Sequence, residues 1–173
     1  MLDIEKPAWL QGTSLLPLVK GEADEVNEAV FAEVSYHGSY QPMRSMRTQR
    51  YKYIRRFYEQ PEPMLSNVDG SPTKNLWMEH GWFDRHEERE ALYDLLFDSM
   101  ERVNLAHNDE LSPVLEGMRA HLERWMRDTG DPLLEGDIHL PKGAQTTLPY
   151  HPGRPSRVVD DREWNAMLTR SSS

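Results

Sequence analysis

The chain of 173 residues contains no cysteine. Disulfide bonds, thiolate metal sites and a cysteine nucleophile are therefore excluded within this sequence. Long apolar runs are absent as well, because none approaches the roughly 18 residues that a membrane-spanning helix needs. Residues 1–10 also lack the basic and then apolar layout of a signal peptide.

Positive charge is scarce, since 20 lysines and arginines stand against 29 acidic residues, for a net charge of -9. This balance argues against general nucleic-acid binding, because neutralising a phosphate backbone requires a basic surface. We therefore expect any anionic partner to be small, or to meet the chain at one local site.

Several catalytic signatures are also missing. The sequence has no Gly-x-Ser-x-Gly and no glycine-rich phosphate loop. His86-Glu87 begins like a zinc-protease helix, but Glu90 stands where the second histidine is needed. The residues alone thus predict no catalytic group, no metal ligand and no cofactor site in this chain.

The positive charge that is present gathers in residues 42–57, among bulky apolar and aromatic side chains. The cationic residues of this basic segment are Arg44, Arg47, Arg50, Lys52, Arg55 and Arg56. In an extended chain, Tyr51 and Tyr53 fall on one face and Lys52 and Ile54 on the other. Such a strand suits either a negatively charged ligand or a network of salt bridges, and the pattern fits both.

Regular elements are expected on both sides of this segment. Valine-rich and aromatic composition predicts strands over 29–36, 43–48, 51–57 and 90–95, with breaks at 38–42 and 60–74. An apolar stripe predicts a helix over 113–128, with Ser112 as N-cap and Gly130 at its end. Residues 14–19 predict a helical turn or a packed loop, and residues 77–89 show no clean period.

A candidate site lies where the first strand ends. Glu33, Tyr36 and His37 stand close in sequence to the basic segment. A carboxylate, an imidazole and Arg44 can together hold an anionic substrate, with the arginine binding sulfate or carboxylate through two hydrogen bonds. The alternative is a surface rim of salt-bridged polar residues, and composition alone favours that alternative.

The order and spacing of several segments resemble a known family. The segments are Gln11 to Leu18, Glu33 to His37, Pro42 to Thr48, Arg50 to Arg55, Glu90 to Leu95, Asn104 to Ala106, and Trp125 to Pro132. Together they resemble the C-terminal part of a sulfatase, with the strongest likeness to heparan N-sulfatases (N-sulfoglucosamine sulfohydrolases) and their bacterial relatives. The resemblance covers roughly Leu2 to Pro132, the last third of such an enzyme.

The resemblance implies an α+β fold, in which a small antiparallel sheet of about four strands packs with a C-terminal helix and an extended tail follows. In such enzymes this subdomain packs against a large alkaline-phosphatase-like domain. Residues 1–28 would then be a linker and a remnant of the large domain, residues 29–132 the C-terminal subdomain, and residues 133–173 the tail. The tail, which shows no hydrophobic period, is expected to wrap a surface or to be partly disordered.

The family's chemistry implies what this chain lacks. The large domain carries calcium ligands and a formylglycine nucleophile made from Cys-x-Pro-Ser-Arg or Ser-x-Pro-Ser-Arg, and neither motif occurs here. We therefore expect substrate recognition without nucleophile or metal ligands, inactivity of the isolated chain, and calcium and formylglycine only in the full-length enzyme. The implied partners are a sulfatase catalytic domain and a sulfated saccharide. Full-length members are usually periplasmic, secreted or lysosomal.

The resemblance also assigns candidate site residues. Glu33 matches a substrate-contacting glutamate of the family, and His37 and Arg44 are further substrate-binding candidates. The spacing from Glu33 to Pro42 is longer than in the mammalian N-sulfatase, which puts His37 on an insertion. Two other functions stay open: a stand-alone interaction or glycan-binding module, and an inactive truncated fragment.

Overall fold

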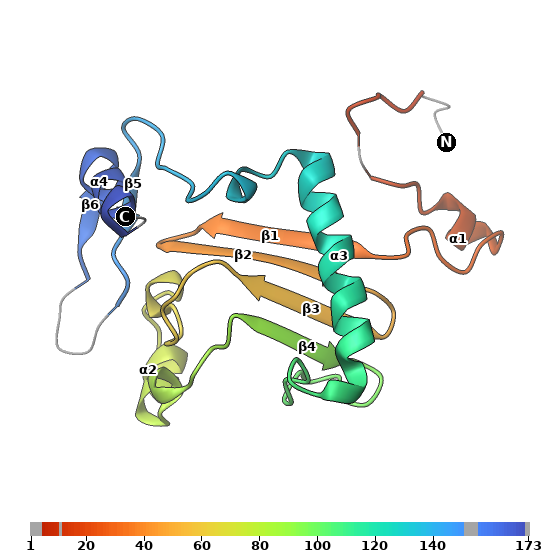
Figure 1. The fold of residues 1–173 in the computed structure, drawn as a ribbon, viewed down its shortest axis with the longest axis horizontal. Helices are drawn as coiled ribbons and strands as arrows, with labels where there is room; N and C mark the ends of the chain where they lie inside the picture. Colours follow the sequence, from red (N-terminus) through yellow and green to blue (C-terminus); the bar gives the residue numbers. More distant parts are fainter. Residues whose placement is uncertain (1–4, 11, 151–155, 172–173) are drawn as a thin grey trace.

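A four-stranded antiparallel sheet forms the centre of the computed structural model, which describes residues 5–10, 12–150 and 156–171. The strands follow one another in sequence order: β1 (Val30–Tyr36), β2 (Tyr40–Arg47), β3 (Tyr51–Arg56) and β4 (Glu90–Asp94). The long helix α3 (Ser112–Thr129) crosses one face of this sheet (Figure 1). The predicted α+β subdomain, with a small antiparallel sheet of four strands and a helix packed on it, is confirmed.

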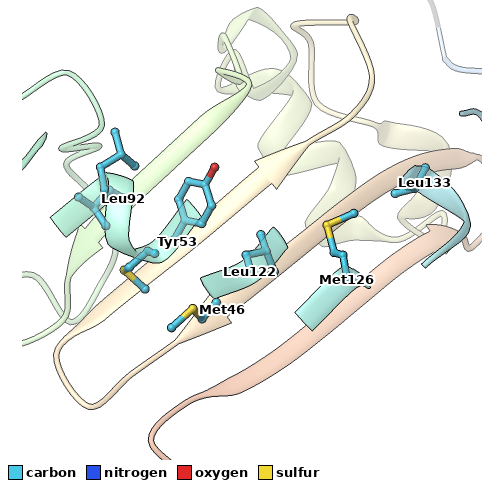
Figure 2. Packing of buried hydrophobic residues seen from close by; sticks show 8 residues of the cluster. Met46, Tyr53, Leu92, Leu122, Met126 and Leu133 are labelled. Atoms are coloured by element: carbon cyan, nitrogen blue, oxygen red, sulfur yellow. The ribbon is translucent and has the colours of Figure 1, made fainter. Parts of the chain in front are cut away.

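The main core lies between α3 and the sheet. Heptad-like spacing places Leu115, Met118, Leu122 and Met126 on the buried face of α3. Figure 2 shows Leu122 and Met126 among the side chains of the strands and of the segment after α3. Those partners are Met46, Tyr53, Leu92 and Leu133.

The two ends of α3 differ in how well they were predicted. Gly130 ends the helix with a left-handed φ of 64°, and its N–H bonds to the carbonyl of Arg127, as expected. The predicted N-cap was wrong, because Leu111 occupies that position and Ser112 is already helical. The physical reason is the preceding 3₁₀ turn η3 (Asp109–Leu111), which feeds directly into the helix.

Strand β2 begins earlier than the sequence indicates. A break was predicted over 38–42, yet β2 starts at Tyr40 and contains Pro42. The register of β1 against β2 shifts between Val34 and Tyr36, opposite this proline. Such an irregularity accommodates a residue without an N–H, so Pro42 is tolerated inside the strand.

Short helices occupy the connection between β3 and β4. The predicted loop over 60–74 contains η1 (Leu65–Asn67) and runs into α2 (Pro72–Glu79), whose N-cap Ser71 accepts a hydrogen bond from the Lys74 N–H. The unassigned stretch 77–89 contains the end of α2 and η2 (Trp82–Asp84). None of the helices in the described ranges combines the length and apolar character that crossing a bilayer demands.

The described parts of the segment 133–173 fold back onto the end of the sheet (Figure 1). The segment carries β5 (Gln145–Thr147), β6 (Val158–Asp160) and α4 (Asp161–Ser171), and η4 (Pro132–Leu134) leads into it. Figure 1 shows these elements beside the turn between β1 and β2. These elements were not predicted, because the strands have only three residues each and the segment's apolar side chains gather with Tyr40 in a second core. Its other members are Leu140, Val159, Trp164 and Leu168.

The N-terminal helix α1 (Leu16–Lys20) confirms the predicted helical turn, but it buries no residue. Leu15 and Val19 are 62% and 80% exposed. On the sheet face opposite α3, a shallow hollow of about 320 Å³ is lined by side chains of β1, β2 and β3. Most of its lining is apolar, including Ala32, Val34 and Met43.

These surfaces predict that the isolated chain self-associates or binds a hydrophobic dye. Exposed apolar patches beyond a few hundred Å² are rare on soluble monomers. We expect concentration-dependent mass in light scattering and enhanced fluorescence of an anilinonaphthalene dye, both reduced in the double variant Leu15→Ser/Val19→Ser. A monodisperse monomer without dye binding would instead indicate an autonomous domain.

Candidate functional site

The basic segment of residues 42–57 is laced by salt bridges. Five of its six cationic side chains lie within 4.0 Å of a carboxylate, and only Arg47 has no such partner among the described residues. The pairs are Arg44 with Asp131, Arg50 with Asp94, Lys52 with Glu101, Arg55 with Glu123, and Arg56 with Glu87. The structure therefore favours the salt-bridge interpretation for most of this segment.

Arg44 is a buried residue with a fully engaged guanidinium. Its side chain is 1% exposed. Nε and Nη2 donate to the two carboxylate oxygens of Asp131, the latter at 2.9 Å. The remaining three N–H groups donate to the carbonyls of Val34 and Met43 and to the hydroxyl of Ser35. Because a guanidinium has five N–H donors, none is left for an anionic ligand in this arrangement.

Asp131 completes this pair and was not among the predicted site residues. Burial alone would raise the pKa of Asp131, but hydrogen bonds from Arg44 and from the Leu133 N–H outweigh it and hold that pKa below its ordinary value. Its sequence context, Gly130-Asp131-Pro132, was interpreted as the end of a helix and as part of the sulfatase resemblance, without a role for the carboxylate. An acidic residue that also caps the next turn was the available signal.

Glu33 lies beside Arg44 but faces solvent. The two residues are directly opposite in the pairing of β1 with β2. Glu33 Oε2 is 3.6 Å from Arg44 Nε, and the glutamate side chain is 63% exposed. An edge strand thus presents an exposed carboxylate next to a buried cation, a position from which hydrogen bonds can be accepted.

His37 does not join this pair. It lies in the turn between β1 and β2, where it is exposed and its backbone N–H bonds to the carbonyl of Ser39. Strand residues advance by about 3.3 Å, so four positions separate it from Glu33 by roughly 13 Å. Tyr36 is structural, since its hydroxyl donates to the Ile138 carbonyl and accepts from the Trp164 indole. The assignment of substrate contacts to Glu33, His37 and Arg44 stays a prediction.

The resemblance implies calcium and formylglycine in the full-length enzyme, and calcium is bound by carboxylate and carbonyl oxygens. Within the described ranges, no three histidine, aspartate or glutamate side chains gather as metal ligands would. Whether the intact enzyme holds calcium and formylglycine stays a prediction.

No family model matches the chain. Comparison with known proteins nevertheless finds relatives that are sulfatases. The chain is 35% identical over 140 residues to an ulvan-active sulfatase of Formosa agariphila, a match that covers 78% of this chain and 28% of that protein. It is 32% identical over 143 residues to human N-sulphoglucosamine sulphohydrolase, covering 73% and 28%. A solved structure of a 2-O GAG sulfatase matches with a TM-score of 0.55 and 25% identity, over 80% of this chain and 24% of that one.

These matches agree with the sheet and helix described above. The chain spans only about a quarter of the length of the relatives that it matches. Both the curated relatives and the solved structure are sulfatases. The chain is therefore homologous to the sulfatases and matches their C-terminal part.

Proposed function

We propose that this chain serves as the C-terminal subdomain of a sulfatase that acts on sulfated sugars, and that it contributes substrate recognition there. The observation that carries the proposal is 35% identity to a sulfatase, confined to 28% of that protein's length. The names of the relatives refer to ulvan and to N-sulphoglucosamine, and both point to a sulfated sugar.

Hydrolysis of a sulfate ester or sulfamate would depend on groups beyond those identified in this chain. The reaction needs a nucleophile next to the sulfur and a cation that neutralises the developing charge. This sequence has no cysteine and neither formylglycine motif. In our proposal a sulfatase catalytic domain supplies both groups, and this chain supplies shape and charge.

Glu33 is the proposed contact with the sugar. Its exposed carboxylate can accept hydrogen bonds from sugar hydroxyl groups. Arg44, buried beneath it and fixed by Asp131, acts as a positioning residue that keeps a positive charge near this carboxylate. His37 is exposed and free to contact a ligand at the turn between β1 and β2.

The first test concerns activity. We expect no hydrolysis of N-sulfoglucosamine or of an aryl sulfate by the purified chain, with or without calcium, because the nucleophile motif is missing. Sequencing the DNA upstream of the Met1 codon should reveal an in-frame Cys-x-Pro-Ser-Arg or Ser-x-Pro-Ser-Arg segment. Metal-dependent turnover that survives repeated purification would contradict the proposal.

The second test concerns Glu33. In an enzyme that joins this chain to its catalytic domain, Glu33→Gln should lower kcat/KM for the sulfated sugar. The loss of transition-state stabilisation should be about 1.5–3 kcal/mol, the range for a hydrogen bond to a charged group. The melting temperature should change little, because Glu33 is exposed. Glu28→Gln, a change at another exposed glutamate, is the matched control. Unchanged kinetics in the Glu33 variant would leave the salt-bridged rim as the better interpretation.

The upstream sequence also separates the alternatives. Without any sulfatase segment upstream, the chain would act as a stand-alone interaction or glycan-binding module, provided that it binds a sugar. Without binding and without a catalytic partner, it would be an inactive fragment.

A further inference from the structure

Two adjoining hollows lie around η2 and the edge strand β4. The first, of about 270 Å³, is lined by Ala91 and Tyr93 of β4 together with Arg56, Trp82 and other polar residues. Side chains alternate along a strand, so Ala91 and Tyr93 face away from α3, on which Leu92 packs. The first hollow is therefore on the sheet face opposite the helix.

The second hollow, of about 420 Å³, is lined by Trp77, His80, Trp82 and Arg85. Trp82 and Arg85 line both hollows, so the two hollows are neighbours, and together they form a depression. Sites for small molecules commonly enclose about 300–1,000 Å³, so the depression has room for a sugar unit with a substituent.

The carboxylates in the first hollow are already engaged within the chain. Glu101 accepts two hydrogen bonds from Lys52, at 2.9 and 2.7 Å. Glu88 accepts from Asn104 at 3.0 Å and lies 2.6 Å from His107 Nε2. These negative charges therefore have partners of their own.

The carboxylate of Glu87 also has partners within the chain. It accepts a hydrogen bond of 2.8 Å from the hydroxyl of Tyr58, and it lies 3.5 Å from Arg56 Nε. Each of the three carboxylates that line the hollow thus has a partner outside any ligand.

The cationic groups are less well matched. Arg85 and Arg102 line the first hollow, and no side-chain hydrogen bond or ion pair holds either of them among the described residues. Arg56 Nε is buried without a hydrogen-bond acceptor, since the 3.5 Å to Glu87 is long for such a bond. Buried donors of this kind normally find an acceptor. The exposed guanidinium groups of Arg85 and Arg102 therefore offer donors and positive charge to an anion in the depression, and Arg56 adds positive charge beneath it.

The second hollow offers an aromatic surface. The rings of Trp77 and Trp82 meet edge to face, with centroids 4.7 Å apart, and Trp77 is 45% exposed. The π face of an indole carries partial negative charge, which attracts the weakly positive C–H groups on the flat side of a pyranose ring. Two tryptophans beside unpaired arginines therefore suit a sugar that carries an anionic group.

We propose that this depression, the Trp–Arg pocket formed by Trp77, Trp82, Arg56, Arg85 and Arg102, binds a sulfated sugar. The pyranose ring packs on the indoles and the sulfate accepts hydrogen bonds from the guanidinium groups, which match oxyanions with two parallel donors. The proposal rests on the proposed function only for the choice of sulfated sugars, because every contact comes from this chain.

The test is calorimetric titration of the purified chain with glucosamine 6-sulfate at constant ionic strength. We expect saturable binding, and at least 10-fold weaker binding of glucosamine and of inorganic sulfate. Arg85→Gln/Arg102→Gln should weaken binding at least 10-fold, and Trp77→Ala should weaken it as well. Arg124→Gln and Trp9→Ala, at exposed positions outside both hollows, should leave the affinity unchanged.

Far-UV circular dichroism of each variant should match the parent chain, because Arg85, Arg102 and Trp77 are exposed. The absence of saturable binding would overturn the proposal. So would pocket variants that bind glucosamine 6-sulfate as tightly as the two control variants do. Equal affinity for glucuronate would overturn the role of sulfate. Equal affinity for inorganic sulfate, with no effect of Trp77→Ala, would overturn the role of the sugar ring. None of these outcomes alters the tests of upstream sequence and of Glu33, so the two proposals can fail separately.

Discussion

Replacing Arg44 by methionine should lower the free energy of unfolding by about 3–5 kcal/mol, the cost of removing one partner from a buried ion pair. Methionine fills much of the space of the arginine stem, but it leaves Asp131 buried without its two charged hydrogen bonds. The carbonyls of Val34 and Met43 lose a donor as well. Urea denaturation followed by circular dichroism measures the change.

Arg47→Met is the matched control, since Arg47 lies on the same strand and is exposed. We expect it to change stability by less than about 0.5 kcal/mol. The double variant Arg44→Met/Asp131→Leu should recover part of the loss, because no uncompensated charge remains. A loss in Arg44→Met no larger than in Arg47→Met would show that the pair is not structural.

The same pair should make stability depend on pH in one direction. The folded-state pKa of Asp131 is below its ordinary value of 3.8. Its contribution is therefore complete above that value and is lost as the pH falls through the folded-state pKa. The stability difference between the parent chain and Asp131→Asn should accordingly shrink when the urea titrations are repeated below pH 3.8.

Trp164→Ala should destabilise the protein by about 3–5 kcal/mol, the usual cost of truncating a buried tryptophan. Trp164 is 8% exposed in the second core, and its indole N–H donates a hydrogen bond of 2.8 Å to the hydroxyl of Tyr36. Its ring also packs edge to face on Tyr40, with centroids 5.8 Å apart. Because both tyrosines flank the turn between β1 and β2, the loss of stability should also lower the temperature of the main unfolding transition.

Differential scanning calorimetry of the parent and variant chains measures this effect. Trp9→Ala, at a tryptophan that is 79% exposed, is the control and should leave the melting temperature nearly unchanged. An unchanged main transition in Trp164→Ala would mean that the segment 133–173 is docked too weakly to stabilise the sheet.

The sulfatase likeness and the central sheet were predictable from the amino-acid sequence. Apolar and polar residues alternate from Ala32 to Tyr36 and from Tyr51 to Tyr53, and a period of 3.6 marks α3, so local patterns indicate these elements. Gly130 ended the helix where expected, because its left-handed conformation is a local property of the backbone.

The second core depended on contacts that no local pattern reveals. Strands β5 and β6 have three residues each, and Tyr40 and Trp164 lie more than 120 positions apart in the chain. Short elements of this kind gain most of their stability from tertiary packing, so their sequence carries little period. The segment 133–173 therefore resembled an extended tail until its partners were known.

The role of the basic segment was likewise decided by tertiary structure. Its charge pattern was determined by the sequence, and it was compatible with both an anion site and a salt-bridge network. Folding brought Asp131, 87 positions away, onto Arg44 and occupied that guanidinium. Arg85 and Arg102, in contrast, line a hollow beside Trp82 and find no ion-pair partner in the part of the chain that the structure describes. Charge is written in the sequence, but whether a charge is matched depends on distances of a few ångströms that only the folded chain sets.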